Sequence, residues 1–558
     1  MNDREAFLSE IRATPEDDAP RLIYADWLEE RGDPRAEFIR VQCELARMQV
    51  WEDGYRGLRD REDALLELYA DRWLKELPTW KGIRLDHRYV SSYSRGFIKW
   101  ARVDDVTTFI QHGEELFNAE CLQGIELVEL HADQLNLFLN SPHLAQLRQL
   151  RFSKGGRAGI GPKGVKDLAA SSRLGQLRML DLSSNNIGIA GAEALAASPH
   201  LVNLKSLDVG SNDVRDEGVE ALASSRRLDR LQTLNLWDNE IGDRGAQALA
   251  DSSLSASLND LTLGDNRIGP IGAAACGTFP ELRSLHLNKN NIQATGASAM
   301  AGSPCLEKLE VLGLGSNQIG LEGSVVIAES PFLNRLKQLY IHDNEIGESG
   351  AAALATSPNL LQVRELYIRG NAIGDRGASA LAASRYLVNL RKLSLSGNQI
   401  GESGAVSVAS SANLSQLTEL QLSENAIGTA GAKAVIDSLF LTQLRVLFLY
   451  ETNLTGSVSS LLKSAPPQLT SLYLGRNQLG TEGVRALVKS PVVAQLKELG
   501  LDKVGIGDIG AEVLATSPRL GQLRLLDLCA NQIGDVGARA LAHSPYLGRL
   551  GLLIMWFN

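Results

Sequence analysis

Cysteine is scarce in this chain, and the spacing of the cysteines excludes two common roles. There are five of them, they are scattered, and none forms a Cys-x-x-Cys pair. A disulfide framework needs an even set of partners, and a zinc knuckle needs closely spaced ligands. We therefore expect buried thiols in a reducing compartment at Cys43, Cys121, Cys276, Cys305 and Cys529.

Long apolar runs and a targeting segment are also missing. No run of 18 or more apolar residues occurs, and residues 1–18 lack a basic segment followed by an apolar one. A membrane-spanning helix needs about 20 apolar residues, and a secretory leader needs both of those segments. The sequence thus predicts a cytoplasmic protein that makes no membrane contact.

Positive charge is in short supply as well. Lys and Arg number 56 against 66 Asp and Glu, which gives a formal net charge of −10. A field of this sign repels a phosphate backbone. Nucleic acid is accordingly not an expected partner.

Catalytic signatures are missing too. Neither His-Glu-x-x-His nor Gly-x-Ser-x-Gly occurs, and the eight histidines are dispersed, so no triad is indicated. The run from Gly156 to Lys163 resembles a phosphate-binding loop, but proline precedes its lysine and no Ser or Thr follows. Its Ile160-Gly161 aligns instead with a turn that recurs along the chain. We expect no enzymatic activity, no cofactor and no metal.

What the chain has in abundance is a repeated unit. The pattern L-x-L-x-x-N-x-I-G-x-x-G-A-x-A-L-A is clearest in the segment 180–204. Alternate leucines predict a short strand, asparagine ends it, Ile-Gly turns the chain, and a helix of small residues follows. The asparagine, which we name the ladder position, recurs as Asn185, Asn212, Asn239, Asn266, Asn290, Asn317, Asn344, Asn371, Asn398, Asn425, Thr452, Asn477, Val504, Asn531 and Asn558.

Twelve of the fourteen steps between ladder positions are 27 residues long. The steps into Asn290 and Asn477 are 24 and 25 residues, so we expect those deletions in the helix or the loops around it. A buried asparagine can donate to and accept from backbone groups that leave the strand, so stacked asparagines join successive turns. Threonine at 452 can replace part of this bonding and valine at 504 cannot, which predicts local loosening or a bound water near Val504.

Strands lie about 4.8 Å apart while packed helices need about 9 Å, so a stack of such units bends with its strands inside. The pattern resembles the leucine-rich repeats of the ribonuclease-inhibitor type. The resemblance implies an α/β fold, a right-handed leucine-rich-repeat solenoid or horseshoe, with a concave parallel β-sheet and convex helices. We expect about 16 units over residues 121–558.

Residues 1–120 follow a different pattern. Apolar residues at helical spacing predict helices over 3–13, 20–29 and 59–77, with one more before the last. The run EDDAPRLIYADWLEERGD from Glu16 to Asp33, and the RAEFIRVQ that follows Pro34, resemble the bacterial repeat-companion domain, a helical module found in front of repeats. That family carries no assigned chemistry, so the resemblance implies only a small N-terminal α-helical domain.

The positions four and two residues before the ladder position point from the strands into the concavity. Large side chains cluster there in a chain with 5% aromatics, and exposed aromatic and arginine residues are typical of protein-binding hot spots. The alternative is that neighbouring tyrosines stack on one another for stability. The predicted partner-binding residues are Trp237, His286, Tyr340, His342, Tyr367, Arg369, Phe448, Tyr450, Tyr473 and Arg476.

These observations predict a non-enzymatic scaffold that binds a protein partner on the concave face of the repeats. Two alternatives remain open. One is an inhibitor or activator of a partner enzyme, of the GTPase- or nuclease-regulator type. The other is a self-assembling structural protein, in which the apolar C-terminal strand from Leu552 to Phe557 pairs with a second copy to form a homodimer.

Overall fold

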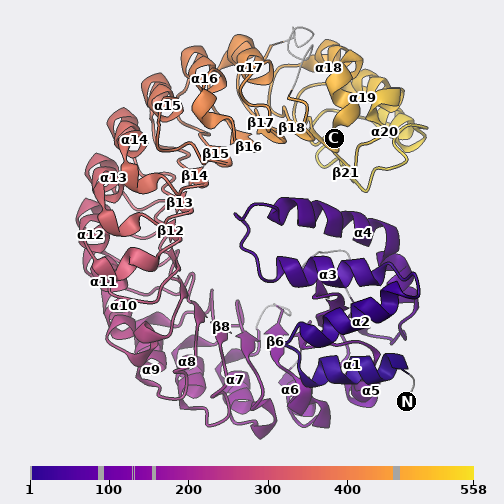
Figure 1. Ribbon diagram of the computed structural model, residues 1–558, viewed down its shortest axis with the longest axis vertical. Coiled ribbons are helices and arrows are strands. Elements are labelled where there is room, and N and C mark those ends of the chain that lie inside the picture. The colour runs from indigo at the N-terminus through magenta and orange to yellow at the C-terminus, as the bar shows by residue number, and fades with distance from the viewer. Residues whose placement is uncertain (1–2, 86–92, 129, 131, 154–158, 456–465) are drawn as a thin grey trace. The chain divides into compact units, whose positions relative to one another are not determined.

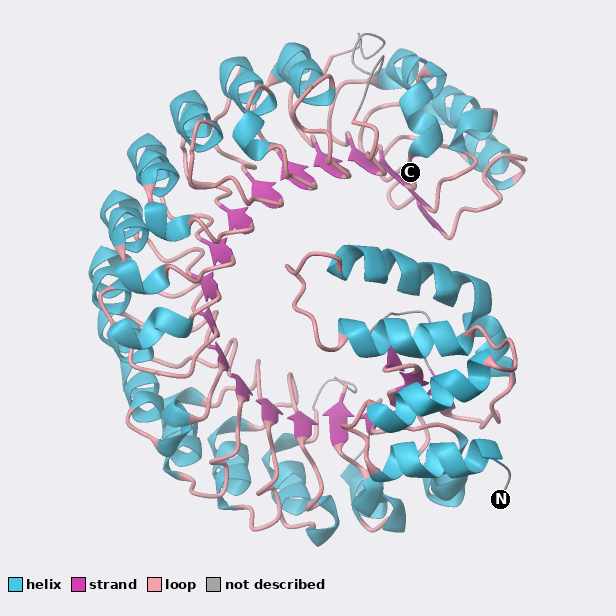
Figure 2. Cartoon of the chain, viewed as in Figure 1, coloured by secondary structure: helices cyan, strands magenta, loops and turns pink. Residues whose placement is uncertain are grey.

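The computed structural model of the chain describes residues 3–85, 93–128, 130, 132–153, 159–455 and 466–558. It separates into two compact units, unit 1 (residues 1–266) and unit 2 (residues 267–558). Short strands alternate with helices through the repeats of each unit, which makes the fold α/β (Figure 2). The predicted domain boundary near residue 120 lies inside unit 1 and stays a prediction.

Unit 1 opens with the four helices that the apolar spacing predicts, although the last begins at residue 55 and ends at residue 75 rather than spanning 59–77. They are α1 (Asp3–Ala13), α2 (Ala19–Glu29), α3 (Arg35–Leu45) and α4 (Tyr55–Lys75). Their core includes Ile11, Tyr24 and Ile39, and Phe97 from a later hairpin packs into it. Phe38 is fully buried against Trp73, at 4.9 Å between ring centroids.

The rest of unit 1 is a parallel sheet with helices. β2 (Tyr93–Ser94) and β3 (Phe97–Ile98) form a hairpin, and β1 (Ile83–Leu85) pairs antiparallel with β4 (Trp100–Val103). Parallel strands continue in sequence order as β5 (Gly124–Leu127), β6 (Gln149–Phe152), β7 (Met179–Asp181), β8 (Ser206–Asp208), β9 (Thr233–Asn235) and β10 (Asp260–Thr262). The helices are α5 (Val106–Ala119), α6 (Ala132–Leu139), α7 (Gly161–Ala169), α8 (Gly188–Ala197), α9 (Arg215–Ser224) and α10 (Asp243–Ala250).

Unit 2 repeats one strand and one helix with little variation. Its parallel strands are β11 (Ser284–His286), β12 (Val311–Gly313), β13 (Gln338–Tyr340), β14 (Glu365–Tyr367), β15 (Lys392–Ser394), β16 (Glu419–Gln421), β17 (Val446–Phe448), β18 (Ser471–Tyr473), β19 (Glu498–Gly500), β20 (Leu525–Asp527) and β21 (Leu552–Ile554). Its helices are α11 (Pro270–Cys276), α12 (Gln293–Ala301), α13 (Gly320–Glu329), α14 (Gly347–Thr356), α15 (Gly374–Ala382), α16 (Glu402–Ala409), α17 (Gly428–Ile436), α18 (Gly480–Lys489), α19 (Gly507–Ala515) and α20 (Asp535–Ala542). Within this unit the strands line the inner side of an arc and the helices its outer side (Figure 1).

The asparagine ladder forms as predicted. Asn344 is fully buried, and its Nδ2 donates to the carbonyls of Leu314, Ile341 and His342 at 2.8–3.1 Å. Its Oδ1 accepts from the backbone N–H of Asn317, one repeat earlier, at 2.9 Å. Each ladder asparagine of this kind therefore joins two turns through backbone groups that would otherwise be buried without partners.

The two interruptions of the ladder behave differently. Thr452 Oγ donates to the carbonyl of Leu449 at 2.9 Å, so threonine replaces part of the asparagine bonding, as expected. Val504 is buried and its backbone N–H donates to Asn531 Oδ1 at 3.0 Å, while its side chain contributes hydrocarbon only. The loosening or bound water expected near Val504 stays a prediction.

The shortened step into Asn290 is shared between α11, which has seven residues against eight to ten in the other helices of unit 2, and the loop that follows it, which is also shorter than after α16 or α20. The other shortened step spans residues 456–465, which lie outside the described residues. In the glycine-rich run at 156–163, whose first three residues are likewise not described, Gly161 N–H donates to the carbonyl of Asn185 at 3.0 Å. Gly188 makes the same bond to Asn212, so this stretch is a repeat turn.

Candidate protein-binding surface

The strand register of unit 2 brings three predicted residues together. Tyr340 pairs with Tyr367 across β13 and β14, and their rings stack in parallel, with centroids 4.5 Å apart. The ring of His286, on β11, lies 6.0 Å from that of Tyr340. Gly313 lies between them on β12, where a Cβ would approach His286 Nδ1 to 2.8 Å. The missing side chain at Gly313 therefore makes room for the two rings to meet.

The hydroxyl groups of the stacked tyrosines are already bonded within the sheet. Tyr340 OH donates to Gln338 Oε1 at 3.3 Å, and Tyr367 OH donates to Glu365 Oε2 at 3.1 Å. Burial, together with Glu365, raises the pKa of Tyr340 to about 12, and the same causes raise the pKa of Tyr367 further. Both phenols therefore remain protonated hydrogen-bond donors at neutral pH.

Two further predicted residues border these rings. His342 lies over Gly315, where a Cβ would fall 2.1 Å from the imidazole, and its Nδ1 lies 3.2 Å from Asp343 Oδ2. Arg369 is more than half exposed, and its Nη2 donates to both carboxylate oxygens of Glu424 at 3.0 Å, two repeats along the sheet. We name His286, Tyr340, His342, Tyr367 and Arg369 the tyrosine cluster.

A second group, the phenylalanine cluster, consists of Phe448, Tyr450, Tyr473 and Arg476. Phe448 and Tyr473 stack in parallel at 4.5 Å, and Tyr450 lies 5.8 Å from Tyr473. Tyr473 OH donates to Glu498 Oε2 at 2.6 Å. Arg476 lies 3.8 Å from both Glu451 and Asp502, so its charge is compensated within the cluster.

Glycine again makes room for the rings of the phenylalanine cluster. A Cβ on Gly475 would lie 2.6 Å from the Tyr450 ring, and one on Gly500 would lie 2.6 Å from the Tyr473 ring. The rings thus lean over the neighbouring repeats. All the aromatic rings of both clusters are half-buried, so the stacking interpretation and the binding interpretation each find support in this geometry.

Trp237 belongs to neither cluster. It follows β9 in unit 1, is 40% exposed, and its backbone N–H donates to Asn235 Oδ1. Acidic residues beside the rings were not predicted from the sequence. Glu365, Glu424 and Glu498 each accept a hydrogen bond from a residue of one of the two clusters. An acid directly before the central leucine of the strand, in Glu365-Leu-Tyr367 and at Glu498, is the signal that could have indicated them.

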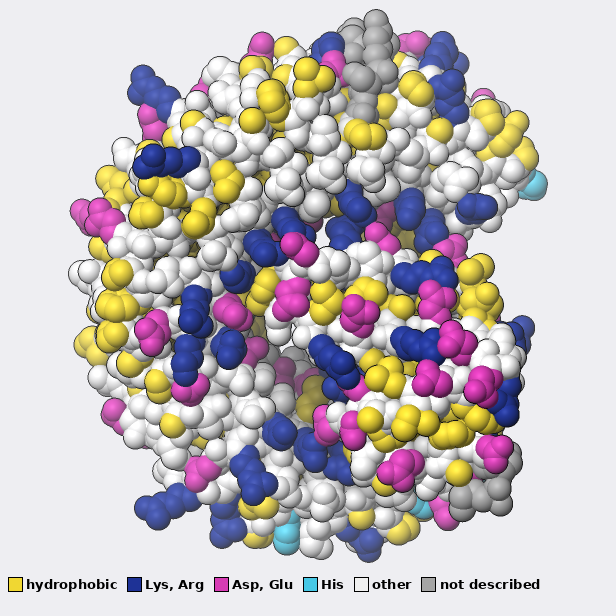
Figure 3. All heavy atoms as spheres, in the orientation of Figure 1, with side chains coloured by type: hydrophobic (Ala, Val, Ile, Leu, Met, Phe, Trp, Pro, Cys, Tyr) yellow, Lys and Arg dark blue, Asp and Glu magenta, His cyan; other side chains and the backbone are white. Residues whose placement is uncertain are grey.

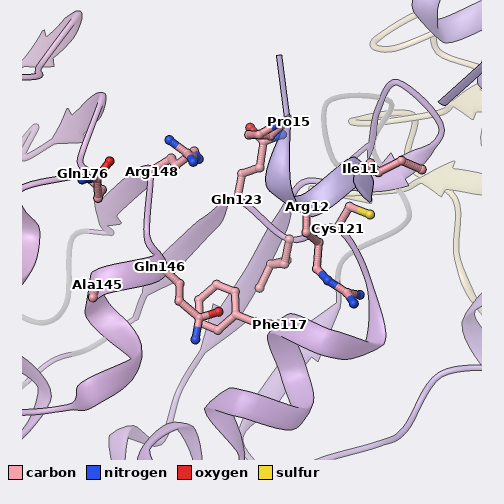
Figure 4. A pocket seen from close by; sticks show the side chains of 11 residues that line it. Ile11, Arg12, Pro15, Phe117, Cys121, Gln123, Ala145, Gln146, Arg148 and Gln176 are labelled. Atoms are coloured by element: carbon pink, nitrogen blue, oxygen red, sulfur yellow. The ribbon is translucent and has the colours of Figure 1, made fainter. Parts of the chain in front are cut away.

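A separate cavity of about 240 Å³ lies in unit 1, between α1 and the first repeats. Phe117 and Cys121 contribute to its walls, and Arg12 and Arg148 hold their guanidinium groups on opposite sides of it in Figure 4. Arg12 is engaged, because it donates to the carbonyl of Asn118 at 3.0 Å and pairs with Glu5. The two cations therefore do not converge on one point.

Metal and thiol chemistry find little support in these side chains. Across the described ranges, no group of three or more His, Cys, Asp or Glu residues is arranged to hold a metal ion. The cysteines are unbridged, and burial raises the pKa of both Cys43 and Cys121 to about 12, which disfavours a nucleophilic thiolate. Cys305 and Cys529 are half-buried rather than buried as expected.

In the described part of the chain, no helix has both the length and the apolar character needed to cross a membrane.

Comparison with solved structures finds matches of low sequence identity. An internalin from Listeria monocytogenes is 23% identical, with a TM-score of 0.35, and the match covers 63% of this chain and 87% of that one. A TLR13–ssRNA13 complex is 18% identical, with a TM-score of 0.37, and the match covers 78% of this chain and 61% of that one. No curated protein matches the sequence.

The family model described as Leucine Rich repeat matches nine segments, which begin in unit 1 and continue through unit 2. They are residues 177–196, 200–223, 231–250, 281–301, 363–382, 386–409, 414–435, 466–488 and 523–542. Each segment that lies within the described residues carries the strand, ladder position and helix found in the structure. These nine segments are therefore similar to leucine-rich repeats.

Proposed function

We propose that this protein is a non-enzymatic scaffold whose protein partner docks on the strand face of unit 2. Leucine-rich repeats generally mediate protein–protein interaction. The observation that carries the proposal is the pair of preformed clusters, in which parallel strands hold stacked rings and an arginine in place. Such side chains lose little conformational entropy on binding, and aromatic and arginine residues supply most hot-spot energy.

The test is affinity capture from a native cell extract with the full chain and a quadruple variant, Tyr340→Ala, Tyr367→Ala, Phe448→Ala and Tyr473→Ala. We expect the variant to lose the partner. A matched variant, Leu321→Ala, Leu439→Ala, Phe440→Ala and Ile509→Ala, removes exposed apolar side chains that lie outside the strands and should retain it. Retention of every captured protein by the first variant would refute the proposed surface.

Stacked rings also stabilise the sheet, so a second variant separates binding from folding. Arg369→Ala removes an exposed ion pair that contributes little to stability, and it should weaken the same capture with little change in the melting temperature. If the captured protein is an enzyme, its turnover with and without the chain distinguishes a scaffold from an inhibitor or activator.

The C-terminal strand favours a second proposal, self-association. Leu552, Leu553, Trp556 and Phe557 are 50%, 37%, 72% and 87% exposed, which places large apolar side chains at one end of unit 2. Such a surface is unfavourable in water unless further polypeptide covers it, and a second copy of the chain can do so. Light scattering should show dimers that are lost in the variant Leu552→Lys, Trp556→Lys; a monomer in both cases would rule out this dimer.

A further inference from the structure

A file of basic side chains runs along the edge of unit 2 where its strands begin. These residues lie seven positions before each ladder position, and backbone hydrogen bonds join them from one repeat to the next. Arg364 N–H donates to the carbonyl of Lys337 at 2.8 Å, and Arg391 N–H donates to the carbonyl of Arg364 at 2.7 Å. The full file is Arg283, Glu310, Lys337, Arg364, Arg391, Thr418, Arg445, Thr470, Lys497, Arg524 and Gly551. We name it the basic column, because seven of its eleven residues are Lys or Arg and one is acidic.

The charges of the basic column are close neighbours. Adjacent strands lie about 4.8 Å apart, and like charges opposite one another on neighbouring strands are destabilising. Lys337, Arg364 and Arg391 directly precede three successive strands, and Figure 3 shows Lys and Arg side chains following one another along the inner side of the arc of unit 2. Burial first, and Arg364 second, lower the pKa of Lys337. The column therefore concentrates positive charge in a chain whose net charge is −10.

The fold does not require a cation at this position. Threonine occupies it twice, and its hydroxyl donates to the carbonyl of the preceding residue in the file, from Thr418 to Arg391 at 3.0 Å and from Thr470 to Arg445 at 3.3 Å. A neutral side chain can therefore occupy the same position of the repeat. The repeat itself therefore does not fix the charge at this position.

Acidic side chains also lie on the strand face. Glu365, Glu419 and Glu498 begin strands directly after the basic column. Asp502 lies two residues after the end of β19, and Asp527 is the last residue of β20. A nucleic-acid backbone laid over this surface would meet these carboxylates as well as the column. A polypeptide can present acidic side chains to the column and other side chains to the acids, so the two-signed surface favours a protein.

We infer that the basic column is a docking site for an extended, acidic polypeptide segment of the partner. The inference rests on the proposed function and adds the chemistry of what is bound. Lys337, Arg364 and Arg391 directly precede β13, β14 and β15, and the first two of these strands carry Tyr340 and Tyr367. An acidic segment along the column therefore borders the tyrosine cluster, where its apolar side chains find the stacked rings.

The test measures fluorescence anisotropy of a labelled polyglutamate peptide titrated with the full chain at low and at physiological salt. The variant Lys337→Glu, Arg364→Glu, Arg391→Glu should weaken binding about tenfold or more, and salt should weaken the parent. The matched control Arg376→Glu, Lys433→Glu, Arg485→Glu changes the net charge equally, but on α15, α17 and α18. It should leave the affinity within about twofold, because those charges lie on the helical layer.

Three outcomes overturn the inference: no binding of polyglutamate by the parent, equal weakening by both charge variants, or tighter binding of a charge-matched single-stranded oligonucleotide than of polyglutamate. The neutral variant Lys337→Gln, Arg364→Gln, Arg391→Gln should give an intermediate loss, and it decides the matter if the charge reversal does not fold. Both column variants are also used in partner capture. If the aromatic quadruple variant abolishes capture and the column variants do not, the proposed function stands and the acidic segment is refuted. If every variant retains capture, the proposed function is refuted.

Discussion

At the scale of single residues, the repeats depend on buried polar groups that each have several partners. Asn344 contributes three donated bonds and accepts from the backbone N–H groups of Asn317 and Ile319. A side chain that is removed from such a place leaves backbone groups of two repeats buried without partners, and that costs more than the bonds themselves contribute.

Asn344→Ala should therefore lower the free energy of unfolding by about 3 kcal/mol. The measurement is the urea midpoint followed by circular dichroism. Asn334→Ala is the control, because Asn334 is exposed and donates a single bond to Pro331, and it should change the stability by less than about 0.5 kcal/mol. Equal midpoints for the two variants would contradict the structural role of the ladder.

Asp502 shows the opposite situation, a carboxylate in an unfavourable place. Burial raises its pKa, Asp527 raises it further, and its Oδ1 is buried without a hydrogen bond. A carboxyl with a raised folded-state pKa stabilises the fold below its unfolded pKa and loses that contribution as pH rises through the folded pKa. Ionised Asp502 therefore costs stability at neutral pH.

Asp502→Asn should raise the urea midpoint at pH 7, and the gain should vanish below the ordinary aspartate pKa of about 4, where the carboxyl is protonated in both the folded and the unfolded state. Asp535→Asn, on an almost fully exposed side chain, should have no effect at either pH. A gain that persists unchanged in acid would show that charge is not its cause.

At the scale of elements, one buried ion pair ties α3 to the chain that follows α5. Arg35 Nη2 lies 2.6 Å from Glu120 Oε1, and both side chains are at most 5% exposed. Arg35 Nε also donates to the carbonyl of Gly96 at 3.2 Å, so one guanidinium contacts both the hairpin and the segment before β5. A buried pair of this kind is costly to break because the remaining charge stays desolvated.

Glu120→Ala should destabilise unit 1 by about 3 kcal/mol and increase proteolysis between α1 and α4. Glu76→Ala, which breaks the exposed pair with Arg72, should cost less than about 0.5 kcal/mol. Replacing both partners, as Arg35→Met with Glu120→Leu, should recover much of the loss, and a double variant less stable than Glu120→Ala would contradict the ion-pair explanation.

At the scale of the whole molecule, stability should be a sum of local contributions. In each unit the helices and strands pack on the next repeat, as α14 does on α15 and β13 on β14, and the energy of such an array is carried by nearest neighbours. A defect should therefore spread only to adjacent repeats.

Hydrogen exchange of the intact chain tests this locality. Asn344→Ala should accelerate exchange in the repeats around β13 and leave α1 to α4 protected, while Glu120→Ala should do the reverse. Their destabilisations should add within about 0.5 kcal/mol in the double variant. Loss of protection throughout both units from either change would show global cooperativity instead.

The sequence alone determined the parts of this protein that depend on local periodicity. Strand, turn and helix alternate with the 27-residue pattern, and the ladder bonds follow from buried asparagines at its fixed position. The helices at the start of unit 1 were predictable for the same reason, because apolar residues at helical spacing indicate a helix with one buried face. The helix α1 begins and ends at the predicted residues. Stacking of Tyr340 on Tyr367 could be anticipated once the register was known.

Only the tertiary structure decided what those side chains meet across repeats. It showed that glycines at 313, 315, 475 and 500 give the rings room, and that Glu365 and Glu498 accept hydrogen bonds from the tyrosine hydroxyls. The residues of the basic column can be identified in the sequence. Only the backbone hydrogen bonds between successive members show that they lie next to one another. These members are 25 to 27 residues apart along the chain, so their proximity is a property of the stacked repeats and not of any local sequence pattern.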